Sequence, residues 1–184
     1  MVLVAGVLIA GAAIVAMVLL GGATSKSAAA TTATGSTGST GATGPAPAGI
    51  KVPGISSTDA AAAIDAAAAR YNVPRYVMYG MFDVETSLGA GMGTSSTGAM
   101  GPFQFEPGTA AGYGYPMTNT PSLAQFQQQA DSAAHYLSDL FRQEGNSWTT
   151  ALAAYNAGPG NTSAGMGYAA RAIAAGQRLV GTAG

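Results

Sequence analysis

The residue with the clearest capacity for chemistry is Glu85, which follows a run of apolar residues. Large side chains recur before it at three- and four-residue intervals, at Tyr76, Met78, Met81 and Phe82. That spacing predicts a helix with one apolar face that leads to Glu85. Burial disfavours the charged form of a carboxyl group, so a glutamate at this place can keep its proton near neutral pH and donate it as a general acid. The alternative is an exposed glutamate at a helix end, where its charge would oppose the helix dipole.

Two further segments, both rich in small and polar residues, follow Glu85 along the chain. Residues 95–104 read SSTGAMGPFQ, and residues 154–158 read AYNAG. Together with Glu85 and Thr86, these segments resemble the catalytic domain of the soluble lytic transglycosylases, goose-type-lysozyme-like enzymes that cut the glycan strands of peptidoglycan. The resemblance extends over roughly residues 58–161.

Three positions depart from the pattern of that family. Thr86 stands where serine is usual, Pro102-Phe103 replaces Leu-Met before Gln104, and Glu106 occupies a position that is commonly methionine. The first two changes are conservative for the wall of a groove. The third introduces a carboxylate close to the resembling segment.

The resemblance implies a reaction that needs one carboxyl group, whereas glycosidases ordinarily use two. Glu85 would first protonate the bond between N-acetylmuramic acid (MurNAc) and N-acetylglucosamine (GlcNAc). It would then act as a base on the C6 hydroxyl group of MurNAc, which gives a 1,6-anhydro product. The sugar's own N-acetyl group and C6 hydroxyl replace the external nucleophile and water, and no metal or organic cofactor takes part.

Five residues are candidates for binding the glycan. Ser95 can donate a hydrogen bond, Gln104 carries an amide with two donors and an acceptor, and Gly98 lets the backbone approach the sugar closely. By resemblance, Tyr155 and Asn156 border the cleft near Glu85 and hydrogen-bond the transition state. The alternative for Tyr155 is an aromatic side chain in the core.

Two other functions stay open at this point. Goose-type lysozymes place an aspartate two positions beyond the corresponding glutamine, where it helps to position a water molecule. Glu106 would take that part in a hydrolase that inverts the configuration. The second alternative is a membrane-tethered scaffold that binds peptidoglycan without cutting it, although the presence of Glu85, Gln104, Tyr155 and Asn156 together argues against it.

The elements that must position these residues are helices. Apolar spacing and capping residues predict helices over residues 59–71, 74–87, 122–143, from 146 or 147 to 157, and 164–179, with a short helical turn after Pro107. No segment alternates as a strand does, apart from a possible short hairpin around Phe103. The fold expected is mainly α and lysozyme-like.

The N-terminal third of the chain has a different composition. Residues 2–23 are uncharged and apolar, and a helix of that length matches the roughly 30 Å hydrocarbon core of a bilayer, so residues 1–23 are predicted to be a transmembrane helix. The alternative is a cleaved signal peptide. Residues 24–54 are rich in Ala, Thr, Gly, Ser and Pro and are predicted to be a flexible linker. Residues 55–184 would form the catalytic domain.

Charge and cysteine content exclude several classes of function. Residues 55–184 hold eight acidic and five basic side chains, a net charge of −3, so no basic patch suggests a nucleic-acid partner. The chain has no cysteine and one histidine, His135, which excludes disulfides and the usual zinc sites. The expected partners are a peptidoglycan strand, a membrane through residues 2–23, and virion or envelope-complex proteins. The expected location is a virion membrane or the bacterial inner membrane, with the catalytic domain facing the wall.

Overall fold

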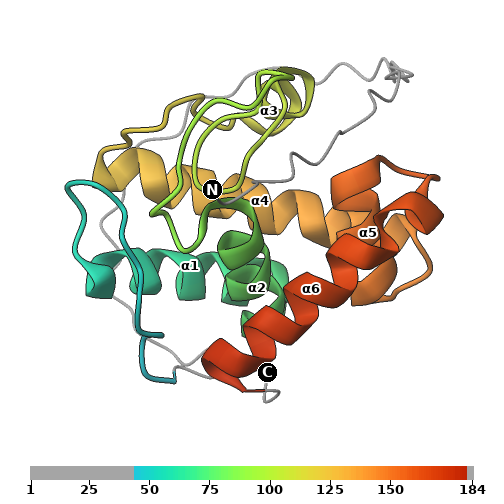
Figure 1. The fold of residues 1–184 in the computed structure, drawn as a ribbon, viewed down its shortest axis with the longest axis horizontal. Coiled ribbons are helices and arrows are strands. Elements are labelled where there is room, and N and C mark those ends of the chain that lie inside the picture. The colour runs from blue at the N-terminus through green and yellow to red at the C-terminus, as the bar shows by residue number, and fades with distance from the viewer. Residues whose placement is uncertain (1–43, 182–184) are drawn as a thin grey trace, which may run out of the picture.

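The structure of the protein, a computed structural model, describes residues 44–181. Within that range six α-helices are joined by loops (Figure 1). They are α1 (Ser57–Tyr71), α2 (Arg75–Thr86), α3 (Pro107–Tyr113), α4 (Leu123–Gln143), α5 (Trp148–Ala157) and α6 (Thr162–Val180). The described residues form no strand, and the expected hairpin is reduced to an isolated antiparallel bridge between Met100 and Phe105. The predicted mainly α fold is confirmed.

Side-chain caps fix where three of the helices begin. The Ser56 hydroxyl accepts a hydrogen bond from the Asp59 N–H at the start of α1. Ser122 and Gln125 form a reciprocal capping box before α4, and Ser147 caps α5. Each cap satisfies a backbone N–H that has no carbonyl partner within its helix. α4 and α5 therefore begin where the sequence predicts, whereas α1 begins earlier than Asp59.

α2 lies near the centre of the molecule, and α6 packs directly against it (Figure 1). The two backbones approach closely at two glycines. A Cβ atom at Gly80 would lie 1.9 Å from the carbonyl oxygen of Ala172, and one at Gly176 would lie 1.7 Å from that of Tyr76. Since no side chain fits in this space, the two glycines allow α6 to lie against the helix that carries Glu85.

A cluster of phenylalanines fills the core between α2, α4 and the loop before α3. The ring centroid of Phe82 lies 5.4 Å from that of Phe103, and the Phe103 centroid lies 6.2 Å from that of Phe126. All three side chains are fully buried. The expectation that Phe103 lines a groove wall is therefore wrong, because its ring extends into the core.

The packed domain begins before the boundary predicted at residue 55. Ile50 and Val52 are both buried in the core, and the Lys51 N–H donates to the carbonyl oxygen of Leu88 at 2.8 Å. These two apolar side chains stand in a segment rich in Pro and Gly, which is why the composition of the segment suggested a linker. Residues 44–54 are part of the domain, and the rest of the predicted linker lies outside the described residues.

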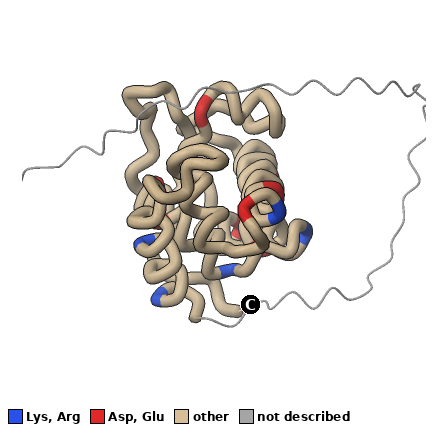
Figure 2. The backbone as a smooth tube through the Cα atoms, turned by 90° about the vertical axis from the view of Figure 1, so that its right-hand side faces the viewer, with Lys and Arg blue, Asp and Glu red and all other residues tan. Residues whose placement is uncertain are grey.

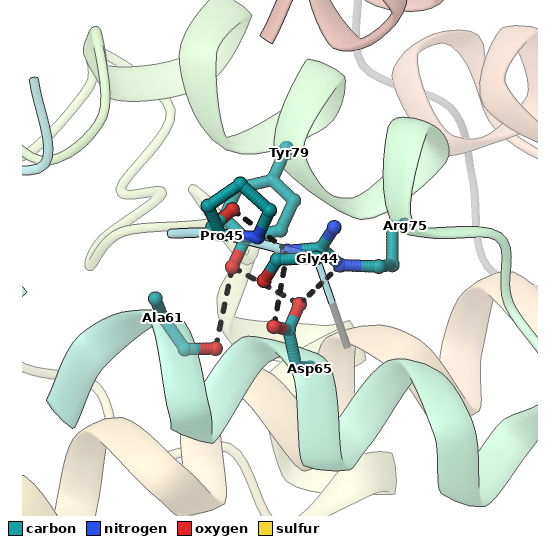
Figure 3. Close-up of polar contacts among 6 residues, drawn as sticks. All are labelled: Gly44, Pro45, Ala61, Asp65, Arg75 and Tyr79. Atoms are coloured by element: carbon teal, nitrogen blue, oxygen red, sulfur yellow. Dashed lines mark hydrogen bonds and ion pairs between the residues drawn. The ribbon is translucent and has the colours of Figure 1, made fainter. Parts of the chain in front are cut away.

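A buried polar cluster ties the beginning of this segment to α1 and α2 (Figure 3). Arg75 donates from Nε to Asp65 Oδ1 at 2.8 Å and from Nη2 to Asp65 Oδ2 at 3.1 Å. Its Nη2 also lies 3.4 Å from the carbonyl oxygens of Gly44 and Pro45. The Tyr79 hydroxyl adds a hydrogen bond to Asp65 Oδ1 at 3.1 Å. Every charged group in the cluster has a partner, as burial requires.

The predicted transmembrane helix, residues 1–23, lies outside the described residues. Across residues 44–181, none of the helices combines the length and the apolar character needed to cross a bilayer.

Candidate active site

Glu85 lies in the last turn of α2, immediately before the helix ends at Thr86. Its Oε1 atom accepts a hydrogen bond from the Tyr168 hydroxyl at 2.6 Å. Burial raises the pKa of Glu85 to about 7, while the hydrogen bond from Tyr168 acts in the opposite direction. No Lys or Arg of residues 44–181 forms an ion pair with it. A carboxyl group in this setting exchanges a proton near neutral pH, which suits a general acid and base.

Tyr168 comes from α6, 83 residues further along the chain, and sequence reasoning missed it. Burial, followed by the charge of Glu85, raises its pKa well above the usual value, so its hydroxyl remains a donor. The other buried residues of α6 are Gly165, Ala169, Ala172, Ala175 and Gly176. A single tyrosine on a face of alanine and glycine was the signal in the sequence, because a large polar side chain on such a face needs a partner on the facing helix.

Tyr155 and Asn156 lie in the last turns of α5. The Tyr155 hydroxyl donates to the carbonyl oxygen of Phe103 at 2.5 Å, and its ring packs edge-on against Phe105 with 6.0 Å between centroids. Burial, followed by the charge of Glu85, raises its pKa well above the usual value. Tyr155 is thus a packed aromatic residue whose polar end lies near Glu85. Among residues 44–181, the Asn156 side chain has no hydrogen-bond partner.

Gln104 lies in a tight turn between the residues of the Met100–Phe105 bridge. Its backbone has a positive φ of 47°, and its Nε2 donates to the carbonyl oxygens of Gly93 and Gly101, at 2.9 Å each. Both donors of the amide are therefore used to hold the loop together. The amide oxygen accepts no hydrogen bond within residues 44–181.

Ser95 and Gly98 form a second turn in the same loop. The Ser95 Oγ accepts from the Ala99 N–H at 2.9 Å and from the Thr97 N–H at 3.3 Å, and the Gly98 N–H donates to the Ser95 carbonyl oxygen at 3.1 Å. Gly98 has a φ of 92°, which favours glycine. The Ser95 hydroxyl also donates to Thr97 Oγ1, because the Thr97 hydroxyl gives its own hydrogen to Glu106. The structure thus gives the Ser95 hydroxyl partners within the loop.

Glu106 directly precedes α3, and its side chain contacts the loop that contains Ser95 and Gly98. Its Oε1 atom accepts a hydrogen bond from the Thr97 hydroxyl at 2.5 Å, and the Thr97 hydroxyl is also 2.9 Å from Ser95 Oγ. Within residues 44–181 Glu106 makes no hydrogen bond to Glu85 or to its partner Tyr168. The polar candidates therefore fall into two groups, one around Glu85 and one joining Ser95, Thr97 and Glu106.

Thr86 connects the helix of Glu85 to the loop that carries Gln104. Its hydroxyl lies 3.0 Å from the carbonyl oxygen of Pro102 and 3.2 Å from that of Phe82, and it accepts from the Gly89 N–H at 3.2 Å. The side chain is buried. The hydroxyl makes all of these bonds, so threonine can stand where serine is usual.

The described residues do not bring together three His, Asp or Glu side chains that could hold a metal ion.

Comparison with known proteins finds similarity to transglycosylases. The family model of the transglycosylase SLT domain matches residues 62–174. An inactive mutant of the lytic transglycosylase Slt from Pseudomonas aeruginosa is similar in structure, with 23% identity and a TM-score of 0.45 over 63% of this chain and 21% of that chain. The 70 kDa soluble lytic transglycosylase Slt70 from Escherichia coli has 24% identity and a TM-score of 0.36 over 65% of this chain and 23% of that one. The match thus spans less than a quarter of either enzyme.

Proposed function

Because this chain belongs to the transglycosylase SLT domain family, we propose that it cuts the glycan strands of peptidoglycan by the lytic transglycosylase reaction. The observation that carries the proposal is the environment of Glu85. It is a buried carboxyl group whose pKa is raised to about 7 and whose hydrogen bond comes from a neutral hydroxyl. A group of this kind can give up a proton and take one back within a single catalytic cycle.

The first step is protonation of the leaving group. Glu85 donates its proton to the oxygen that links MurNAc to GlcNAc, and the bond from MurNAc C1 to that oxygen breaks. The oxygen of the MurNAc N-acetyl group stabilises the electron-deficient C1 until O6 attacks it. GlcNAc leaves with a hydroxyl group, and Glu85 is left as a carboxylate. The Tyr168 hydroxyl, 2.6 Å from Oε1, stabilises that charge.

The second step returns the proton. The Glu85 carboxylate takes the proton of the MurNAc C6 hydroxyl while O6 attacks C1, which closes the 1,6-anhydro ring and consumes no water. Gln104 offers its amide oxygen to the sugar, and Asn156 offers an unengaged amide. Tyr155 holds the Phe103 carbonyl and so fixes the backbone that directly precedes Gln104.

The proposal gives Glu106 no part in the chemistry. An inverting hydrolase needs a second carboxylate that activates water across the sugar from the acid. Glu106 already accepts a hydrogen bond from the Thr97 hydroxyl. The chemistry proposed here uses Glu85 alone, and the products of the reaction separate it from hydrolysis.

Mass spectrometry of the released muropeptides tests this proposal. The full-length chain, in mild detergent, is incubated with purified peptidoglycan beside the Glu85→Gln variant. The expected result is anhydro-muropeptides from the wild type and at least about a hundredfold less of them from the variant. Products with reducing ends would show hydrolysis. Glycan that is bound but not cut would instead support the non-catalytic scaffold.

The proposal includes a place of action. The apolar composition of residues 2–23 and the Ala/Thr/Gly/Ser-rich composition of residues 24–43 support a membrane anchor and a spacer. An anchored domain of this size suits local opening of the wall, as in the entry of a phage genome or the assembly of an envelope-spanning machine. Flotation of the full-length chain with lipid vesicles, and loss of flotation on deletion of residues 1–23, are the expected outcomes.

A further inference from the structure

Arg171 lies on α6 one helical turn beyond Tyr168, so both residues face the same flank of the helix. Its Nη1 donates to the carbonyl oxygen of Gly167 at 3.1 Å, and Gly167 directly precedes Tyr168 in the chain. The guanidinium group therefore lies along the turn of α6 that holds the partner of Glu85. Consistent with this position, the charge of Arg171 lowers the pKa of Tyr168, against the larger effects of burial and Glu85.

Arg171 differs from the other arginines in having no acidic partner in residues 44–181. Arg70 pairs with Asp131, Arg75 with Asp65, Arg142 with Asp139 and Arg178 with Asp83. Charged residues are sparse along the described chain (Figure 2), so a cation that stands without an acidic partner beside the candidate site is distinctive. Arg178 lies on the same helix and is also exposed, which makes it a natural comparison.

The space beside Arg171 is open. A Cβ atom at Gly167 would lie 3.7 Å from Arg171 Nη1 and meet nothing else within 4 Å. Both residues are exposed. One of the five N–H donors of the guanidinium group is used by the Gly167 carbonyl, and the others remain available in the planar arrangement that matches a carboxylate.

We propose that Arg171 binds a carboxylate carried by the muramyl substituent of the substrate and thereby favours acidic over neutral glycan. The inference rests on the function proposed above. In peptidoglycan the MurNAc lactyl group is extended by a peptide stem whose free carboxylates are the available anions. Where the stem has been removed, the lactyl carboxylate itself is free. Arg171 is thus a specificity-determining residue, and the proton transfers remain with Glu85.

A cycle of two changes tests the pairing, one in the protein and one in the substrate. Arg171→Gln is compared with the wild type on native peptidoglycan and on peptidoglycan whose carboxylates have been converted to amides. An exposed ion pair contributes little, so we expect kcat/KM to fall about threefold to fivefold on native substrate, mainly through KM. On amidated substrate the two proteins should be equal, and the difference on native substrate should shrink at high salt.

The controls separate this inference from a change in folding. Arg178→Gln, on the same helix, should match the wild type on both substrates, and thermal unfolding should show that Arg171→Gln is as stable as the wild type. On strands stripped by an amidase, a persisting difference assigns the pairing to the lactyl carboxylate, and a lost difference assigns it to the peptide stem. An equal effect on native and amidated substrate, or none on either, overturns the inference. A wild-type protein that cuts neither substrate overturns the proposed function itself.

Discussion

Two largely buried carboxyl groups lie beside opposite ends of α2, Asp65 on α1 and Glu85 in the last turn of α2 itself. Their surroundings differ in one respect. Asp65, facing the first residue of α2, accepts two hydrogen bonds from Arg75 and one from the Tyr79 hydroxyl. Glu85, at the last turn of α2, accepts a hydrogen bond from the Tyr168 hydroxyl and has no basic partner in residues 44–181. Both acids have a tyrosine, and one has an arginine. The arginine makes Asp65 half of a structural ion pair, whereas its absence leaves Glu85 free to exchange a proton.

The strongest test of this difference is to replace the carboxyl group of Glu85. Glu85→Gln should lower the release of muropeptides by about a hundredfold to ten-thousandfold, because general acid catalysis contributes that much to such reactions. The measurement is the rate of release from purified peptidoglycan. Glu106→Gln is the matched control and should stay close to the wild type. A comparable loss in both variants would contradict the assignment of the chemistry to Glu85 alone.

At the other end of α2, removing one partner of the ion pair between Asp65 and Arg75 should lower the stability of the fold. Arg75→Met leaves Asp65 without its cation and should lower the free energy of unfolding by about 3–5 kcal/mol, as for other buried pairs. Urea denaturation measures this change. The double variant Asp65→Leu, Arg75→Met should recover part of the loss. If the double variant is as unstable as the single one, the uncompensated charge is not the cause.

The stability of the fold should depend on pH through Glu85. The pKa of Glu85 is raised from 4.5 to about 7, so its contribution is complete below pH 4.5 and is lost as the pH rises through about 7. The shift corresponds to about 3 kcal/mol. Glu85→Gln, which cannot ionise, should therefore match the wild type at pH 4 and be more stable by up to that amount at pH 8. Thermal unfolding at both pH values measures this, and equal stability at pH 8 would contradict the raised pKa.

The smallest expected effect is that of removing the Tyr168 hydroxyl. The Tyr168 hydrogen bond lowers the pKa of Glu85, so Tyr168→Phe should raise that pKa and move the basic limb of the kcat/KM profile to higher pH. The maximal kcat/KM should fall about tenfold to a hundredfold, since a hydrogen bond to a charged group contributes about 1.5–3 kcal/mol. Tyr79→Phe, which loses the corresponding bond to Asp65, should leave the profile unchanged. A basic limb that moves to lower pH would contradict the role of Tyr168.

Much of the fold was predictable because it depends on local patterns. The apolar spacing before Glu85 and the capping serines before α4 and α5 act within a few residues, and they placed these helices correctly. The identity of Glu85 as the candidate acid followed from the same spacing together with the family resemblance.

The remaining features depend on contacts between distant parts of the chain. Tyr168 reaches Glu85 only because α6 crosses α2 at Gly80 and Gly176, and no local pattern encodes that crossing. Phe103 could serve equally well in a groove wall or in the core until the positions of its neighbours are known. The partners of Ser95 are likewise set by the loop: its hydroxyl accepts from the Ala99 N–H and donates to Thr97.

The attachment of the N-terminal segment has a mechanical consequence. A force transmitted along the chain from residue 43 enters the domain at Gly44 and Pro45, whose carbonyl oxygens are bonded to Arg75 at the start of α2. Further along the segment, the Lys51 N–H donates to the carbonyl oxygen of Leu88, just beyond the end of α2. The load therefore reaches Arg75 and its ion pair before it reaches the turn that carries Glu85. Under such a load, the contacts of Arg75 with Gly44 and Pro45 are stretched before the bond from Lys51 to Leu88.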